Sequence, residues 1–418
     1  MKGRYIKTII CLMSVFCMFS VSSFAGEVEV LHWWTSGGEA KSVAVLKDLL
    51  GKEGHAWKDM AVAGGGGENA MTVLKTRAMA GNPPTAAQVK GPAIQEWAEE
   101  GLLANLDNVA KKENWDTLLP NVIAAVMKHG GNYVAVPVNV HKINWMWCNP
   151  SVFIKAKAKI PTTWDEFETA AKKIQQAGFL PVAFGGQAWQ ETTVFESIVV
   201  GQGGADFYNK ALVKTDPAAL NSPQMVKALE TFKMIKQYTD KNAPGRDWNM
   251  ATAMVINGEA AMQFMGDWAK GEFTAAGKNP GSDYIAVPAP ESAGTYLFNV
   301  DSFIMFEVKD KRDREAQNAM ARLLLDNRFQ EVFNVNKGSI PVKSGVSKTS
   351  FDDIALRSMD AFSAAAVNNT LLPSMAHGMA VSPAVQGAFY DVVTKYYNSD
   401  MTAKEAAAKL VSAIEAAK

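Results

Sequence analysis

The sequence predicts an α/β protein built from two lobes, with a cleft between the lobes and hinge strands that join them. Strand patterns and helix patterns alternate along the chain, which is typical of layered α/β folds. The 418 residues exceed what one hydrophobic core usually organises, so we expect two domains. Short apolar segments at three places could carry the chain from one lobe to the other.

The first elements follow from local patterns. Residues 27–31 alternate polar and apolar side chains, as a half-buried strand does. A Ser-Gly-Gly break follows, and residues 39–50 are predicted to form a helix. A second strand is expected at residues 59–63, and four glycines at 64–67 should end it in a turn.

The next two helices have clear stop signals. A helix over residues 69–80 should end at Gly81 and the proline pair beyond it. Pro92 should open another helix that runs through Trp97 and stops at Gly101.

Capping residues predict helix starts in the second half of the chain. Thr163 and Glu166 form a capping box for a helix that reaches residue 178, and Thr402 and Glu405 repeat it near the C-terminus. A further helix is predicted at residues 313–327. The remaining predicted strands comprise residues 179–184, 258–265 and 297–306. This alternation predicts mostly parallel sheets.

Three apolar segments are candidate crossings between the lobes: residues 135–138, 286–290 and 339–341. They divide the chain into a first lobe of residues 26–136 plus 290–338 and a second lobe of residues 137–289 plus 339–418. A cleft between domains is a preferred place for a ligand.

Residues 1–25 have the pattern of a cleaved export signal. Lys2, Arg4 and Lys7 precede an apolar run at residues 9–21, and small residues before Gly26 suit cleavage. An N-terminal membrane anchor is the alternative, but the apolar run is short for a membrane span. Without this segment the chain has 39 basic and 42 acidic residues, a net charge of −3. We therefore expect a periplasmic protein.

Cysteine usage and charge exclude several classes. Cys148 would be the only cysteine after cleavage, so no intrachain disulfide can form, and we expect it to pack as a small side chain. The balanced charge argues against a nucleic-acid partner. The sequence holds no phosphate-binding loop, nucleophile elbow or metal-ligand spacing, so we predict no cofactor, no metal and no catalytic residues.

Several of the 11 tryptophans stand at the ends of predicted strands or in polar surroundings. Trp33 and Trp34 lie where a strand meets a glycine turn, Trp248 has polar neighbours, and Trp268 follows a strand. An indole ring can stack on the C–H face of a sugar ring and still offer its N–H. Most tryptophans are core residues, but these positions favour a binding role.

Polar candidates for sugar hydroxyls lie near predicted element ends, and they are Glu39, Lys90, Asp301, Lys337 and His377. A hydroxyl both donates and accepts, so a sugar site needs acceptors and donors together. Asp301 stands in an otherwise apolar strand, where a buried charge needs a partner.

The chain resembles the cluster of ABC importer sugar-binding proteins that contains maltose-binding protein, extracellular solute-binding protein family 1. The resemblance rests on the signal peptide and on the segments at residues 31–39, 80–84 and 95–103. The segments at residues 136–147 and 265–268 resemble the bacterial glucose-binding (glucose/mannose) branch. One departure is Thr85-Ala86-Ala87, where the family usually has Asp after the proline pair.

The resemblance implies a type II periplasmic binding protein-like fold and a set of ligand contacts. It adds Asn299 and gives the sugar-binding set as Trp33, Trp34, Glu39, Lys90, Trp248, Trp268, Asn299, Asp301, Lys337 and His377. The resemblance favours a monosaccharide as the ligand, with glucose first and mannose or galactose as further candidates. We expect a monomer that captures the sugar by hinge closure. The protein would then deliver the sugar to the permease of an ABC-type importer.

Two alternatives remain open from the sequence. A secreted glycosidase could use Glu39 and Asp301 as its two carboxylates, although lysines and a histidine beside them favour binding over cleavage. The other alternative is a binding protein for an oligosaccharide.

Overall fold

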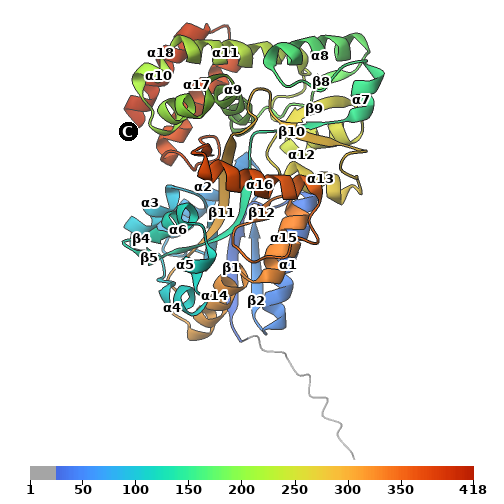
Figure 1. Ribbon diagram of the computed structural model, residues 1–418. Helices are drawn as coiled ribbons and strands as arrows, with labels where there is room; N and C mark the ends of the chain where they lie inside the picture. Colours follow the sequence, from blue (N-terminus) through green and yellow to red (C-terminus); the bar gives the residue numbers. More distant parts are fainter. Residues whose placement is uncertain (1–24) are drawn as a thin grey trace, which may run out of the picture.

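A computed structural model describes residues 25–418 of the chain. The predicted export signal, residues 1–25, therefore lies outside the described residues except for Ala25. Two lobes lie one above the other (Figure 1). Each lobe is an α/β unit with its own sheet.

The first lobe is built on a seven-stranded sheet in which six strands follow the order β12-β6-β11-β3-β1-β2, with β13 paired to β11. Its strands are β1 (Glu27–His32), β2 (Ala56–Ala61), β3 (Ala86–Val89), β6 (Ala135–Lys142), β11 (Tyr296–Met305), β12 (Ile340–Pro341) and β13 (Leu371–Pro373). A separate two-stranded hairpin of β4 (Lys128–His129) and β5 (Asn132–Tyr133) directly precedes β6 in the sequence.

The second lobe has a four-stranded sheet in the order β10-β7-β9-β8. Its strands are β7 (Trp145–Cys148), β8 (Leu180–Val182), β9 (Ala260–Phe264) and β10 (Ile285–Pro288). Cys148 is buried and free, and burial raises the pKa of its thiol, which confirms its prediction as a packed side chain.

The prediction of mostly parallel sheets is wrong, because both sheets are mixed. β1 pairs parallel with β2 and β3, but β11 pairs antiparallel with β3 and β6. β7 likewise pairs antiparallel with both of its neighbours, β9 and β10. The physical reason is that β11 returns to the first lobe from the second lobe and enters the sheet in the reverse direction between β3 and β6.

Helices cover the sheets. Those of the first lobe are α1 (Gly37–Lys52), α2 (Glu68–Met79), α3 (Ala93–Glu99), α4 (Asp107–Lys112), α5 (Trp115–Leu118), α6 (Asn121–Val126), α14 (Lys311–Leu323) and α15 (Asn327–Lys337). Those of the second lobe are α7 (Pro150–Lys155), α8 (Trp164–Gln176), α9 (Ala188–Tyr208), α10 (Pro217–Leu220), α11 (Pro223–Ile235), α12 (Trp248–Ile256), α13 (Ala269–Ala275), α17 (Pro383–Asn398) and α18 (Ala403–Ala417). Helix α16 (Asp353–Val367) runs along the junction of the lobes (Figure 1).

Most predicted elements are present, with shifts at their ends. The second strand lies earlier than predicted, at Ala56–Ala61, because it pairs residue by residue with all of β1. The helix predicted at 313–327 is α14, which ends earlier, at Leu323, because Asp326 caps the next helix and accepts from the amides of Arg328 and Phe329.

The two predicted capping boxes have different outcomes. The box of Thr402 and Glu405 is confirmed, since both reciprocal hydrogen bonds are present. At the start of α8, Thr163 accepts from the Glu166 amide as predicted. The Glu166 carboxylate instead accepts from the backbone and hydroxyl of Thr162, so the reciprocal half of that box is wrong.

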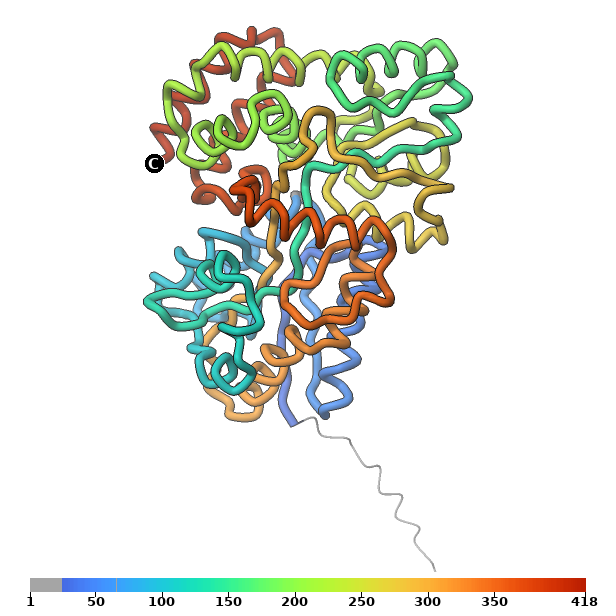
Figure 2. The backbone as a smooth tube through the Cα atoms, in the orientation of Figure 1, coloured from blue at the N-terminus to red at the C-terminus, as the bar shows by residue number. Residues whose placement is uncertain are grey.

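Two separate hydrophobic cores match the two lobes. They meet along β11 and β13, where Leu297 and Leu372 pack in the second core while their neighbours Phe298 and Leu371 pack against the first. The chain passes between the lobes at β6, β11 and β13, which are neighbouring strands of the first sheet (Figure 2). Strand β12 pairs with β6 in the first sheet rather than forming a crossing. The other lobe limits drawn from the sequence remain a prediction.

Candidate ligand-binding site

A cavity of about 140 Å³ lies between the lobes, and side chains from both lobes line it. Its lining residues are Trp33, Trp34, Thr35, Ser36, Glu39, Ala63, Gly64, Gly66, Lys90, His141, Gln187, Trp189, Asp247, Trp248, Asn249, Trp268, Asn299, Asp301, Lys337 and His377. The structure therefore brings all ten sequence-predicted residues to one cavity.

The two tryptophans at the end of β1 differ in how much of each ring is buried in the core and how much faces the cavity. Trp34 is 2% exposed, and its ring packs against Phe303 and Phe333 at centroid distances of 5.5 and 5.2 Å. Trp33 is only half-buried, and the Lys90 ammonium lies 5.1 Å from its ring centroid. Trp33 therefore offers more ring surface to a ligand than Trp34 does.

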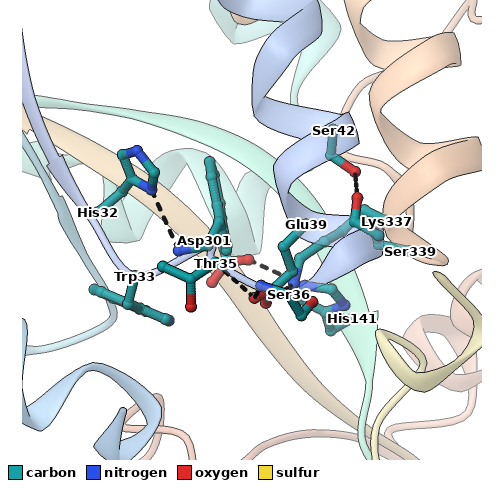
Figure 3. A network of polar contacts seen from close by, with 12 residues as sticks. His32, Trp33, Thr35, Ser36, Glu39, Ser42, His141, Asp301, Lys337 and Ser339 are labelled. Carbon is teal, nitrogen blue, oxygen red and sulfur yellow. Dashed lines mark hydrogen bonds and ion pairs between the residues drawn. The ribbon is translucent and has the colours of Figure 1, made fainter. Parts of the chain in front are cut away.

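Glu39 connects the start of α1 to the end of α15. One carboxylate oxygen accepts from the amides of Thr35 and Ser36 at 3.1 and 3.3 Å. The other accepts from the Lys337 ammonium at 2.6 Å. Both charged groups are almost fully buried, so each depends on the other for its charge partner (Figure 3).

Asp301 is held at the centre of the first sheet. The register of β11 against β6 shifts between Asp301 and Ser302, and such an irregularity re-aims a side chain. One Asp301 oxygen accepts from the Gln88 amide at 3.2 Å, and the other lies 3.0 Å from His141 Nε2. His141 Nδ1 also contacts the carboxylate of Asp267, so the imidazole bridges two acids (Figure 3 shows its Asp301 side).

The charges of this group reinforce one another. Burial disfavours a charged His141, but the carboxylates of Asp267 and Asp301 override it and raise the imidazole pKa. Burial alone would raise the pKa of Asp301, but His141, Lys337 and Lys90 hold it well below its usual range. Burial lowers the pKa of Lys90, although Asp301 opposes this effect. Asp301 is therefore an ionised hydrogen-bond acceptor in the cavity wall.

The second lobe supplies an aromatic wall. The Trp268 ring lies 4.9 Å from the His377 ring and 6.3 and 6.5 Å from the rings of Trp189 and Trp248. It also lies 5.2 Å from the ring of His141 on β6. Flat apolar faces on this side thus oppose the charged groups of the first lobe.

Two buried polar atoms in the cavity wall have no hydrogen-bond partner among residues 25–418. They are Ser36 Oγ and Asn299 Oδ1. An unpaired buried polar group costs about 1–3 kcal/mol, which a ligand hydroxyl would remove. Hydrogen bonding in the cavity wall is therefore incomplete without a bound molecule.

Several lining residues were missed by the sequence analysis. They include Thr35, Ser36, His141, Gln187, Trp189, Asp247 and Asn249. Most of them had some signal in the sequence. Thr35 and Ser36 lie within the segment at 31–39, and His141 lies within the segment at 136–147, both of which carry the family resemblance. Asp247 and Asn249 are the polar neighbours of Trp248, and Trp189 stands three residues after a glycine pair. Gln187 has no distinctive local pattern.

The carboxylates are unsuited to glycoside cleavage. A glycosidase needs a protonated acid beside an ionised partner. Asp301 has a lowered pKa, and Glu39 is paired with Lys337.

In the part of the chain that the structure describes, no group of three or more metal-ligating side chains occurs. No helix there is long and apolar enough to cross a membrane.

Known proteins of similar sequence cover nearly the whole chain. Residues 35–327 match the family of bacterial extracellular solute-binding proteins. A probable sugar-binding periplasmic protein of Rhizobium meliloti is 48% identical over 394 residues, which span 94% of this chain and 95% of the relative. The glucose-binding protein GlcS of Saccharolobus solfataricus is 26% identical over 253 residues, 56% of this chain and 45% of that protein.

Solved structures show the same fold. A chitin oligosaccharide binding protein superposes with a TM-score of 0.79 at 19% identity, covering 94% of this chain and 98% of its own. Maltose-bound MalE3 of T. maritima gives a TM-score of 0.75 at 17% identity, covering 93% and 99%. These confirm the predicted two-lobed periplasmic binding protein fold.

The family match and the 48% identity confirm three predictions: the solute-binding family, the periplasmic location and the absence of enzymatic function. The glucose-binding branch is a finer assignment than these comparisons carry. The chain belongs to the bacterial extracellular solute-binding protein family and is a periplasmic binding protein, not an enzyme.

Proposed function

We propose that this protein is the substrate-binding component of an ABC-type sugar importer and that it captures a monosaccharide, glucose, in the cavity between its lobes. The observation that carries the proposal is the composition of the cavity wall. It combines tryptophan rings with ionised acceptors, ammonium donors and unpaired polar atoms.

A sugar ring needs that combination. Its C–H faces suit the rings of Trp33 and Trp268 that line the cavity, while its hydroxyls can donate to Asp301 and accept from Lys90 and Lys337. Hydrogen bonds to charged groups are about twice as strong as neutral ones, which offsets the lost hydration of the hydroxyls. Glucose follows from the resemblance to the glucose-binding branch, and the partial match to GlcS agrees with it.

Contacts across the cleft support capture by hinge closure. The amide of Gly38 at the start of α1 donates to the Glu272 carboxylate of α13 at 2.9 Å. His141 on β6 contacts Asp267 just before α13. A closed form that both lobes stabilise, and that a bound sugar stabilises further, is the requirement for a population shift on binding.

A second cavity favours a longer sugar as the second candidate ligand. It has a volume of about 350 Å³ and shares walls with the first at Trp33, Gly66, Lys90, Trp189 and His377. A disaccharide or oligosaccharide could place one unit in each cavity.

Calorimetric titration of ligand-free protein against glucose, mannose, galactose and maltose tests both candidates. We expect one-to-one binding of glucose that is tighter than that of maltose. Tighter binding of maltose would replace the monosaccharide with the longer ligand. No heat with any sugar would refute the proposal.

A further inference from the structure

The segment that carries His377 is anchored on helix α9. The Ser374 hydroxyl and the amides of Met375 and Ala376 donate to the buried carboxylate of Glu196, at 2.6, 2.9 and 3.2 Å. The His377 amide in turn donates to Ser374 Oγ at 3.1 Å. The backbone beneath the imidazole is therefore fixed.

Another residue of α9 contacts the imidazole itself. The hydroxyl of Thr193 lies 2.9 Å from His377 Nε2, and the Thr193 side chain is fully buried. The same hydroxyl lies 2.8 Å from the carbonyl oxygen of Trp189, one turn earlier on the helix. One proton must therefore serve two short contacts.

The chemistry of the partners decides where that proton goes. A carbonyl oxygen can only accept, so the Thr193 proton must point at the Trp189 carbonyl. Otherwise two oxygens would face each other at 2.8 Å with no proton between them. The hydroxyl then has only lone pairs for His377, so Nε2 must carry a proton and donate it.

The remaining ring nitrogen follows. Burial, together with the nearby charges of Lys90 and His141, lowers the pKa of His377 well below its usual value, so the ring is neutral. A neutral imidazole with its proton on Nε2 has an unprotonated Nδ1. Among the described residues Nδ1 has no hydrogen-bond partner, and His377 lines the cavity. Nδ1 is thus left to the ligand as an acceptor.

We propose that Thr193 is a positioning residue that fixes His377 in the Nε2–H tautomer, so that Nδ1 accepts a hydrogen bond from a ligand hydroxyl. The ligand part of this inference rests on the proposed function. The Nε2–H tautomer of His377 makes the site selective for a ligand group that donates a hydrogen bond to Nδ1. An ether, a fluorine or a carbonyl there would face a lone pair and bind poorly.

The tautomer can be measured without any ligand. Nitrogen-15 NMR of the imidazoles is practicable because the chain has five histidines, and His377→Gln identifies the signal of interest. We expect the Nε2–H tautomer in the wild type and in Thr193→Ser. Thr193→Val removes the hydroxyl and should change the tautomer or mix the two. An Nδ1–H wild type, or a Thr193→Val variant with an unchanged tautomer, would overturn the proposal.

A matched control separates this role from helix stability. Thr192 is the neighbouring fully buried threonine, and its hydroxyl donates to the Ala188 carbonyl at 2.8 Å without reaching a histidine. Thr192→Val should leave the His377 signal unchanged. A change as large as in Thr193→Val would assign the effect to a general disturbance of α9 and refute the specific role.

Sugar analogues test the selectivity. A series of glucose analogues, each with one hydroxyl replaced by fluorine, removes one donor at a time. We expect one analogue to bind wild type and Thr193→Ser at least about tenfold more weakly than glucose, because an acceptor is left unpaired. In Thr193→Val that difference should shrink. If no sugar binds, the proposed function fails while the tautomer result stands. An undiminished difference in Thr193→Val would refute selection by Thr193.

Discussion

The carboxylate of Glu39 and the ammonium of Lys337 form an ion pair at 2.6 Å, although 298 residues separate them in the chain. Their side chains are only 9% and 3% exposed. The pair joins the first turn of α1 to the last residue of α15 at the edge of the cavity. Burial removes both charges from most of their hydration, so each would be destabilising without the other. The ion pair therefore holds the two side chains in place at the cavity edge.

Lys337→Met should weaken both folding and ligand binding. Removing one partner leaves the Glu39 charge buried, which costs about 3–5 kcal/mol of unfolding free energy. The double variant Glu39→Gln with Lys337→Met should recover part of that loss while ligand affinity stays low. Urea unfolding and calorimetric titration measure the two effects. A single variant as stable as the wild type would show that the pair is not buried in solution.

Asp301→Asn should lower sugar affinity by about 5- to 100-fold, because an ionised acceptor becomes a neutral amide. It should also lower the pKa of His141, since one of the two carboxylates that raise it is lost. Titration calorimetry and histidine NMR follow the two changes. Asp360→Asn is the control, because the Asp360 side chain is 79% exposed. Equal affinity of both variants would exclude Asp301 from the site.

Gly38→Ala should hinder closure of the cleft. A methyl group at Gly38 would lie 2.8 Å from the backbone carbon of Gly271 in the opposite lobe, closer than real contacts allow. Gly51 lies in the same helix α1, and a methyl group there would meet nothing within 4 Å. We expect small-angle scattering with saturating sugar to show a larger radius for Gly38→Ala than for Gly51→Ala. Identical compact shapes would contradict a closing contact at Gly38.

Stability should depend on pH through His141. Its pKa is raised in the folded protein, so its stabilising contribution is complete below the unfolded value of about 6.5 and is lost as the pH rises through the folded value. The difference in unfolding free energy between the wild type and His141→Gln should therefore be largest near pH 6 and shrink at alkaline pH. Urea unfolding across this range measures it. A constant difference would mean that His141 does not titrate in this window.

Local chemistry made part of the fold and site predictable. The alternation at residues 27–31 fixed the first strand, and the pair Thr402 and Glu405 fixed the start of the last helix. The position of Trp33 at the end of a strand also predicted its place in the cavity wall, because strand ends in α/β sheets converge on ligand sites. The other predicted contacts came largely from the family resemblance, and the structure brings all ten to one cavity.

Long-range pairing was not predictable. The contacts of His141 with Asp267 and Asp301 span 126 and 160 residues, and Thr193 meets His377 across 184. The apolar strand around Asp301 indicated that its charge needs a partner, but no local pattern identifies which residue that partner is. The reversed entry of β11 between β3 and β6 was missed for the same reason.

The sequence by itself determined most secondary structure elements, the two-lobed α/β fold class and the kind of side chain available to a ligand, because these depend on periodicity, capping and composition within short segments. Only the tertiary structure decided which charges pair, which polar atoms stay free and which nitrogen of His377 is open to a ligand. Those properties depend on distances of a few ångströms between residues that are far apart in the chain. They arise only once both sheets have formed and the lobes have met.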